Sequence, residues 1–379
     1  MYIIKSTSEF KVKGIPLPNF PLLTWNYSND LYDAVEGDIF KEGLKYLLYK
    51  CIKRGRVSSE SSWITYANHL CHFFSFCEDN ELDWRDIAET NEDEMLLALY
   101  RDISIEEFNL SYRTVNQRLR TVIDFYKRAY FHDWIKSLPY SLELVRTKKY
   151  NQSFLAHTDR AGGERASYDV LAKEKPRMIK LLSIVEVRYL LDAIQNPTLK
   201  LMVRLCLQTG IRKEELFEFP LCLIKKPLQG KVSYRVELTK TKGNRGRSID
   251  IPGKLMKDLW RYVNEIRYQQ SLISGIDSKL LFLNDRGVEW NIKTGSFNKA
   301  LNNLNLPFKV YPHKLRHTYA THTLAALLSR KTNTFNPLIY LRDRLGHSSI
   351  NTTMIYVHLV NELMDDLTHQ YQDEINNIV

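Results

Sequence analysis

Residues 312–318 read Pro-His-Lys-Leu-Arg-His-Thr, and this string decides how the rest of the chain is interpreted. Proline is well tolerated in the first turn of a helix, so Pro312 predicts a helix that starts there. His313 and Arg316 are three residues apart and share one face of that helix. Helix N-termini favour phosphate because their first amide N–H groups lack partners within the helix. The string therefore predicts a phosphate-binding helix start that carries a histidine and an arginine.

Four further motifs flank this string. Residues 209–216 read Thr-Gly-Ile-Arg-Lys-Glu-Glu-Leu, residues 241–244 read Thr-Lys-Gly-Asn, residues 345–349 read Leu-Gly-His-Ser-Ser, and residues 352–356 read Thr-Thr-Met-Ile-Tyr. Arg212 and Glu215 follow a glycine at which a helix should stop, and their spacing places them on one face of the next helix. His347 follows another such glycine, nine residues before Tyr356. Alone, each motif has an ordinary structural explanation, such as a surface Arg–Glu pair or a basic hairpin tip, and the ordered set carries the argument.

Two arginines, a lysine, two histidines and a tyrosine suit attack on a phosphodiester without a metal ion. The charge on the non-bridging oxygens must be matched, a nucleophile must attack, and the leaving 5′-oxygen must receive a proton. Arginine suits the first task because its planar fork binds two oxygens and stays protonated. Free tyrosine has a pKa near roughly 10, so nearby cations or a base must help it to lose its proton.

The order and spacing of these motifs resemble those of the tyrosine recombinase (phage integrase) family over roughly the last half of the chain. The resemblance implies that Tyr356 attacks a scissile phosphate and leaves a 3′-phosphotyrosine and a free 5′-hydroxyl. It implies that Lys242 protonates the leaving oxygen and that Glu215 braces the site. The residues that it assigns to charge stabilisation are Arg212, His313, Arg316 and His347. It implies no metal, no ATP and no cofactor.

Some neighbouring residues compete for these roles. Lys240 lies two residues before Lys242, but the Gly243–Asn244 pair favours Lys242, because the family pattern has its lysine directly before that turn. We interpret His317 as a packing or supporting residue rather than a phosphate ligand. Structural roles are expected for the nearby tyrosines Tyr319, Tyr340 and Tyr371. Residues 329–337 stand where many relatives have a short glycine turn, which predicts an altered surface loop.

The composition favours a polyanionic partner. The 379 residues include 54 lysines and arginines against 44 aspartates and glutamates, a formal charge of +10. Nucleic acid is the commonest partner of such a chain, although a merely basic soluble protein would show the same balance. The apolar fraction of 44% can build real cores, and the length suggests two or three domains.

The cysteines and the termini bear on the compartment. Cys51, Cys71, Cys77, Cys206 and Cys222 form neither a zinc-binding nor a Cys-x-x-Cys spacing. Most lie among apolar residues, which favours buried free thiols in a reducing compartment. The N-terminus lacks the pattern of a secretory signal, and no stretch reaches the roughly 18 apolar residues of a membrane span. We therefore expect a cytoplasmic, prokaryotic, nucleoid-associated protein.

The expected fold is mainly α with a small β-hairpin. Residues 1–37 are rich in proline and β-branched residues and predict an extended arm or a small strand unit. Residues 38–145 have helical periodicity with basic faces and predict a compact helical domain. Residues 146–178 are basic and broken by glycines, which predicts a linker that either crosses a DNA backbone or simply tethers two domains. Residues 179–379 predict the catalytic domain, in which alternation over 232–251 is typical of a β-hairpin.

By the resemblance, the helical domain is a core-binding (SAM-like) domain that forms a clamp around double-stranded DNA with the catalytic domain. Four copies would act on two DNA sites, together with a DNA-bending or directionality protein where one is needed. An apolar stripe after Tyr356 could dock on a neighbouring copy or on its own domain; it comprises Leu359, Leu363, Leu367 and Ile375. The further candidate DNA contacts are Arg113, Arg118, Arg120, Lys148, Lys149, Arg177, Lys240 and Arg245.

Other functions remain open at the level of the sequence. One is a recombinase-like protein that binds DNA without cutting it. Another is a type IB topoisomerase or telomere resolvase, which shares the chemistry. A third is a helical transcription regulator that uses residues 38–140 alone. Among recombinases, the extra N-terminal segment favours a phage or mobile-element integrase over a chromosome-dimer resolvase.

Overall fold

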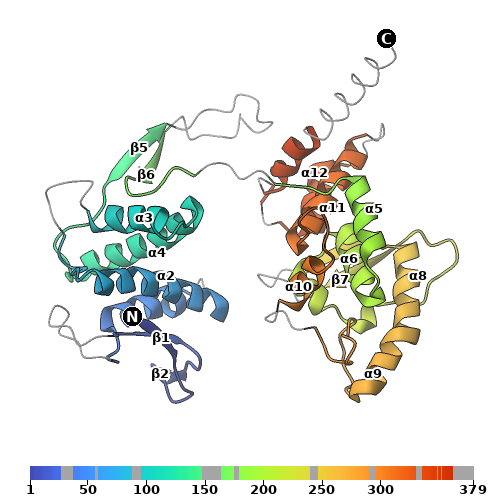
Figure 1. Cartoon of the computed structure of the whole chain (residues 1–379), viewed down its shortest axis with the longest axis horizontal. Coiled ribbons are helices and arrows are strands. Elements are labelled where there is room, and N and C mark those ends of the chain that lie inside the picture. The colour runs from blue at the N-terminus through green and yellow to red at the C-terminus, as the bar shows by residue number, and fades with distance from the viewer. Residues whose placement is uncertain are drawn as a thin grey trace, which may run out of the picture. The chain divides into compact units, whose positions relative to one another are not determined.

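The chain folds into two compact units, Met1–Pro176 and Arg177–Val379, in the computed structural model (Figure 1). Each unit has its own hydrophobic core and is described by itself. The structure describes residues 1–26, 37–55, 59–87, 95–146, 164–174, 179–239, 246–290, 295–329, 335–347, 349–350 and 352–361.

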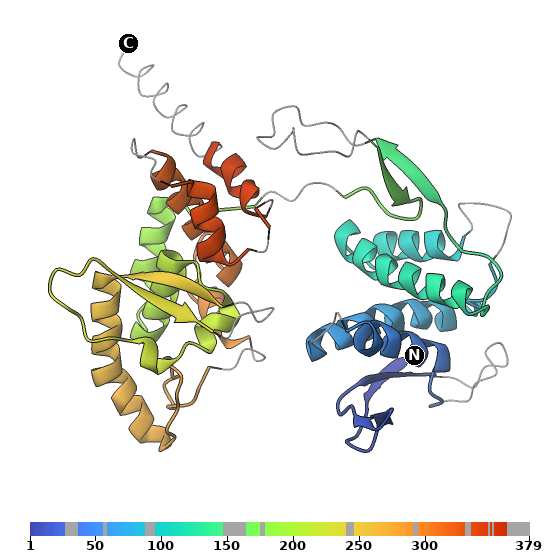
Figure 2. The ribbon, with the colours of Figure 1, turned by 180° about the vertical axis from the view of Figure 1, so that it is seen from behind.

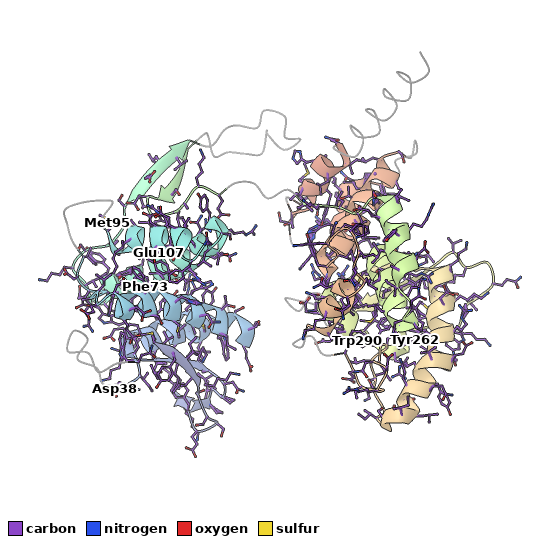
Figure 3. The ribbon with its side chains drawn as sticks, viewed as in Figure 1. Asp38, Phe73, Met95, Glu107, Tyr262 and Trp290 are labelled. Atoms are coloured by element: carbon purple, nitrogen blue, oxygen red, sulfur yellow. The ribbon has the colours of Figure 1, made fainter. Side chains whose placement is uncertain are left out.

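The described residues of the first unit form four α-helices and one short π-helix. These are α1 (Lys41–Leu47), η2 (Leu48–Lys53), α2 (Glu60–Asp79), α3 (Leu96–Glu106) and α4 (Tyr112–Phe131). Helix α4 starts at Ser111, whose hydroxyl accepts a hydrogen bond from the amide of Thr114 at 3.2 Å. The core is strongly aromatic: Phe73 (labelled in Figure 3) packs edge-on against Phe74 and Tyr100. These helices share a single packed core, which also includes residues outside the expected range 38–145.

Residues 1–26 belong to this same core and do not extend away from it. Strand β1 (Tyr2–Lys5) pairs antiparallel with β4 (Pro21–Thr24), and the short β2 (Lys11–Val12) pairs with β3 (Ile15–Pro16). Strands β1 and β4 contact α2, and Figures 1 and 2 both place the strands against one side of the helices. Of the two alternatives for this segment, the structure has the small strand unit rather than the extended arm.

We expect Phe20→Ala to destabilise the first unit by about 3–5 kcal/mol, because the Phe20 side chain is completely buried and its loss leaves a cavity. The free energy of unfolding from urea denaturation measures the effect. Ile15→Ala is the matched control, since Ile15 lies in the same segment and is 64% exposed. Equal stabilities of the two variants would contradict the burial of this segment in the core.

Part of the expected linker is ordered as a β-hairpin. Strand β6 (Glu164–Tyr168) pairs antiparallel with β5 (Leu142–Arg146), and the chain then returns to the first core through the buried Val170. The Asn116 side chain on α4 fixes this return, because its amide donates to the carbonyl of Ala172 at 2.8 Å and its oxygen accepts from the Ala172 amide at 3.0 Å. The proposed DNA contacts Lys148, Lys149 and Arg177 lie outside the described residues.

The second unit is mainly helical around one β-hairpin. Its helices are α5 (Ile184–Ala193), α6 (Pro197–Thr209), α7 (Lys213–Phe217), η5 (Leu221–Leu223), α8 (Gly253–Tyr262), η6 (Val263–Arg267), α9 (Tyr268–Ser274), α10 (Ser296–Asn302), α11 (Pro312–Leu328) and α12 (Pro337–Leu345), and residues 352–361 are also helical. Strand β7 (Ser233–Leu238) pairs with β8 (Arg247–Pro252). The mainly α fold with small sheets is confirmed, and the hairpin falls where the alternation predicted it.

The packing of the second unit brings distant parts of the sequence together. Helix α6 packs along α11, and β8 contacts both α6 and α12. Helix α11 also contacts α12, and Figure 1 shows α11 between α12 and α6. The ends of α6, α11 and α12 and the start of β8 therefore lie close to one another. Among the described residues, no helix is long and apolar enough to cross a membrane.

Candidate active site

Arg316 is the centre of a buried arginine cluster. Its side chain lies on the first turns of α11, and the residue is 4% exposed. The guanidinium donates to the carbonyl oxygens of Gly210 and Leu345, the latter at 2.6 Å. Gly210 and Gly346 end helices α6 and α12 in the left-handed conformation, with φ of 63° and 62°. Arg316 thus binds the C-terminal ends of two helices, where carbonyl groups lack partners within the helix.

Glu215 joins two more arginines to this cluster. Its carboxylate accepts from Arg212 Nη1 at 3.0 Å and from Arg247 Nη2 at 2.6 Å. Arg212 also donates through Nη2 to the carbonyl of Gly346 at 2.9 Å, and Arg247 donates to the carbonyl of Arg344. The side chain of Arg212 is 19% exposed, whereas those of Arg247 and Glu215 are almost completely buried. Arg212 is therefore the most accessible of the three arginines in the cluster.

The cluster carries more positive than negative charge. Burial raises the pKa of Glu215. The hydrogen bond and charge of Arg247 and the contacts with Arg212 together lower it by more, so the net shift of the pKa is downward. Burial, followed by the charges of Arg212 and Arg247, lowers the pKa of Arg316 to about 9. At neutral pH the cluster therefore contains three positively charged arginines and one negatively charged carboxylate. Such an excess of buried positive charge favours binding of an anion.

We expect Glu215→Gln to destabilise the second unit by about 3–5 kcal/mol, because the buried Arg247 then lacks its counter-charge. The net pKa of Glu215 is lowered in the folded state, so its stabilisation is present above the ordinary value of 4.5 and is lost as the pH falls through the folded-state pKa. Thermal unfolding at pH 7 and pH 4 measures both effects. Glu214→Gln, at the exposed neighbouring position, is the matched control; equal losses in the two variants would contradict the role of Glu215.

Tyr356 lies beside this cluster and is 2% exposed. Its ring stacks on that of His347, with centroids 6.2 Å apart and an interplanar angle of 10°. His347 Nε2 lies 3.4 Å from Arg316 Nη2, and its Nδ1 lies 2.9 Å from the hydroxyl of Thr353. Burial, then the charges of Arg316 and Arg212 and further cations, lowers the pKa of His347 to about 4. The imidazole is therefore neutral at neutral pH and can accept a hydrogen bond.

His317 contacts Tyr356, which the sequence analysis did not anticipate. Its Nδ1 lies 3.1 Å from the hydroxyl oxygen of Tyr356, and the two ring centroids are 5.8 Å apart. Burial raises the pKa of Tyr356, and the charges of Arg316 and Arg212 only partly offset this effect. The tyrosine is therefore protonated at neutral pH, with an imidazole at its hydroxyl.

Arg247 is a second residue that sequence reasoning missed. It stands at the start of β8, where residues 247, 249 and 251 alternate inward with a buried pattern. The same alternation, read from the sequence, places Arg247 on the buried side of the hairpin, next to Ile249 and Ile251. An arginine on the buried side of the hairpin, close to a predicted phosphate site, was the signal that could have identified Arg247 as a site residue.

The remaining candidate residues fall in different places. His313 is exposed on the first turn of α11, with its ring centroid 6.2 Å from that of His317. Lys242, Lys240 and Arg245 lie outside the described residues. In the first unit, Arg113 and Arg120 are exposed on α4, and Arg118 is half-buried. Arg120 approaches Glu174 at 3.5 Å, which leaves it only weakly paired at the surface.

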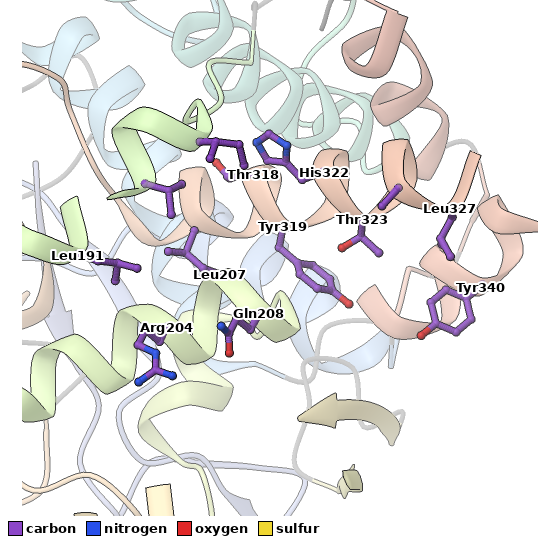
Figure 4. A pocket seen from close by; sticks show the side chains of 13 residues that line it. Leu191, Arg204, Leu207, Gln208, Thr318, Tyr319, His322, Thr323, Leu327 and Tyr340 are labelled. Atoms are coloured by element: carbon purple, nitrogen blue, oxygen red, sulfur yellow. The ribbon is translucent and has the colours of Figure 1, made fainter. Parts of the chain in front are cut away.

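A separate pocket lies on the other side of α11. It encloses about 490 Å³ and is lined mostly by apolar side chains from α5, α6 and α11, with Tyr319, His322 and Tyr340 among them (Figure 4). Tyr319 and Tyr340 therefore point into this pocket, in keeping with structural roles, while Tyr371 lies outside the described residues. Among the side chains that the structure describes, no three His, Cys, Asp or Glu residues gather as a metal-binding group.

Known proteins are similar to this chain in sequence and in fold. Residues 180–362 match the model described as the phage integrase family. The chain is 26% identical over 272 residues to the tyrosine recombinase XerC of Oceanobacillus iheyensis, covering 69% of this chain and 77% of that protein. It is 25% identical over 334 residues to the tyrosine recombinase XerC of Halalkalibacterium halodurans, covering 85% and 94%.

Solved structures share the fold. XerH site-specific recombinase in a post-cleavage complex with palindromic difH substrate gives a TM-score of 0.59 at 17% identity, covering 87% of this chain and 95% of that one. A fragment of the Tn1549 transposon integrase in complex with circular intermediate DNA gives a TM-score of 0.54 at 18% identity, covering 83% and 94%.

The site thus combines a mainly helical fold with a buried tyrosine beside clustered arginines, in a chain whose relatives are DNA recombinases. Residues 180–362 carry a phage integrase family domain, and the chain is similar to tyrosine recombinases, which are site-specific DNA recombinases that act without metal or ATP.

Proposed function

We propose that this protein cuts and rejoins double-stranded DNA at specific sites through a 3′-phosphotyrosine on Tyr356. The observation that carries the proposal is the buried Tyr356 next to an arginine cluster with an excess of positive charge. A scissile phosphate would supply the anion that this cluster lacks. Its attack by Tyr356 keeps the bond energy in the tyrosine–phosphate link, so a 5′-hydroxyl from a second duplex can reverse the step.

The proposed roles divide among six residues. Arg212 and Arg316 bind the non-bridging oxygens, because their guanidinium groups hold positive charge where it builds up on the five-coordinate phosphorus. His347 is held neutral and in contact with Arg316, and it donates a hydrogen bond to the same phosphate. His313 adds a donor from the first turn of α11, and Lys242 protonates the leaving 5′-oxygen. Glu215 keeps Arg212 in place.

The proposed assembly is a clamp around DNA. It consists of a core-binding domain, residues 38–145, and a catalytic domain, residues 179–379. Residues 146–178 connect the two domains, and residues 1–37 extend the core-binding domain at its N-terminus. The exposed Arg113 and Arg120 on α4 and the overall charge of +10 support phosphate contacts, which predicts binding that weakens steeply with salt. We further propose four copies on two DNA sites and association with the prokaryotic nucleoid. An accessory DNA-bending or directionality protein belongs to the same proposal.

The proposed biological role is integration or excision of a mobile element or phage. The likeness in fold to the Tn1549 transposon integrase in complex with circular intermediate DNA supports it. The likeness to XerC proteins supports resolution of chromosome dimers as a second candidate. Supercoil relaxation without recombinant product would instead favour a topoisomerase-like role.

Covalent capture of DNA tests the proposed function. The protein is expressed beside its native DNA neighbourhood, denatured, and recovered with linked DNA whose ends are sequenced. We expect one defined junction, with the linked peptide containing Tyr356 by mass spectrometry. A nicked duplex made from the junction, which prevents religation, traps a short-lived intermediate. Full binding of that duplex with no covalent product would sink the proposal and favour a DNA-binding role.

A further inference from the structure

The hydroxyl of Tyr356 has a histidine placed to receive its proton. His317 and Tyr356 lie 39 positions apart in the sequence, yet Nδ1 of His317 is 3.1 Å from the tyrosine oxygen. Tyr356 is almost completely buried, and its pKa is raised by burial. A nucleophile in this state cannot ionise unaided at neutral pH, so its proton must pass to a base as the oxygen attacks.

The other histidine against the ring of Tyr356 is oriented for a different task. His347 stacks face to face with the tyrosine ring, and its two nitrogens face Thr353 and Arg316. His317 is instead tilted by 48° to the tyrosine ring and directs Nδ1 at the hydroxyl. Imidazole within hydrogen-bond reach is the commonest general base in enzymes.

We propose that His317 is the general base that takes the proton of Tyr356 through Nδ1; this inference rests on the proposed function. The tyrosine O–H bond breaks and its proton moves to Nδ1, while the Oη–P bond forms. The bond from phosphorus to the 5′-oxygen breaks, and that oxygen takes a proton from Lys242. His317 begins as the Nε2–H tautomer and becomes imidazolium. When a 5′-hydroxyl attacks the phosphotyrosine, Lys242 takes the proton of that hydroxyl and His317 returns its proton to the leaving Tyr356 oxygen.

The surrounding charges couple this proton transfer to DNA binding. His313 and Arg316 on α11, Arg212 at the start of α7, and His347 after α12 surround the His317–Tyr356 pair. The positive charges of Arg212 and Arg316 oppose an imidazolium at His317 in the free protein. A phosphate bound to Arg212 and Arg316 supplies negative charge, which favours the protonated form of His317. The base therefore becomes effective when the scissile phosphate is in place.

The rival explanation is that His317 only holds the buried tyrosine in position. Single-turnover cleavage of the nicked duplex by His317→Gln separates the two roles, because glutamine can still accept the tyrosine's hydrogen bond but cannot take a proton. His322→Gln is the matched control. His322 lies five residues further along α11, is partly buried, and bonds through Nε2 to the carbonyl of Leu182 at 3.0 Å in the separate pocket (Figure 4).

A second substrate identifies which proton transfer fails. A duplex with sulfur in place of the bridging 5′-oxygen has a leaving thiolate that needs no proton. With the ordinary phosphate, we expect His317→Gln to lose about 10²–10⁴-fold in rate. The loss in rate of His317→Gln should persist with the sulfur substrate. The loss in rate of Lys242→Ala should largely disappear with that substrate. The wild-type rate should level off above the pKa of the base, while the His317→Gln rate keeps rising with pH as the tyrosine ionises directly.

Three results would overturn the inference. The first is a wild-type cleavage rate in His317→Gln. The second is a reduced cleavage rate that the sulfur substrate returns to the wild-type value. The third is a reduced cleavage rate with an unchanged pH profile, which would assign His317 to positioning alone. Thermal unfolding and DNA binding of each variant check folding, and His317→Asn repeats the test if the glutamine variant is unstable. Absence of covalent product with the wild-type protein itself would instead contradict the proposed function.

Discussion

Replacement of Tyr356 with phenylalanine is expected to abolish covalent linkage to DNA while leaving DNA binding intact. The substitution removes only the hydroxyl, which is hydrogen-bonded to His317, and keeps the ring that stacks on His347. Loss of an enzyme's nucleophile costs on the order of 10⁶-fold in rate, so the expected product lies below detection. Denaturing gel electrophoresis of the protein with labelled nicked duplex measures linkage, and a gel-shift titration measures affinity.

Two further tyrosines make this test specific. Tyr319→Phe and Tyr340→Phe alter tyrosines that line the separate pocket, and each should retain wild-type cleavage. Covalent product in Tyr356→Phe at the wild-type rate would mean that another tyrosine is the nucleophile. Loss of linkage in all three variants, with folding preserved, would point to a general effect on the domain.

Arg316→Lys is expected to lower the cleavage rate by about 10²–10³-fold. The planar fork of Arg316 reaches the carbonyl oxygens of Gly210 and Leu345 and lies 3.4 Å from His347 Nε2. Lysine keeps the positive charge but presents a single ammonium group, which cannot reproduce the paired, directed N–H groups of the guanidinium fork. Single-turnover rates on the nicked duplex, at saturating protein, isolate the chemical step from binding.

The control for this variant is Arg344→Lys. Arg344 is a neighbouring arginine on α12 that is also largely buried and donates to a backbone carbonyl, that of Ser248, but it pairs with Asp250 at 2.8 Å. We expect it to lose stability with little change in the cleavage rate. If Arg316→Lys binds DNA, unfolds at the wild-type temperature and cleaves at the wild-type rate, Arg316 does not bind the scissile phosphate.

The sequence predicted those parts of the site that rest on local order. Arg212, Arg316, His347 and Tyr356 each stand at a helix start or a glycine turn, and the structure brings them together. The β-hairpin was predicted for a similar reason, because its alternation is a property of neighbouring residues. Short-range rules of this kind are visible in one sequence.

The features that escaped prediction depend on contacts between distant residues. Arg247 meets Glu215 across 32 positions, and His317 meets Tyr356 across 39. Strand β1 pairs with β4, and β5 pairs with β6 across the segment taken as a linker. A strand residue whose partner is far away in the sequence looks locally like a loop residue. The strands of the N-terminal segment and of the β5–β6 hairpin could therefore not be assigned from the sequence alone.

The carbonyl oxygens of Gly210, Leu345 and Gly346 have a consequence for turnover. In the free enzyme they hold the guanidinium groups of Arg316 and Arg212 and so act as a built-in substitute for a phosphate. Any anion must compete with these oxygens for the same N–H groups, which penalises weak, singly bonded anions more than a phosphodiester that engages both arginines. Under the proposed function, departure of the DNA would return these N–H groups to the same oxygens, so that product release leaves no buried guanidinium group without a partner.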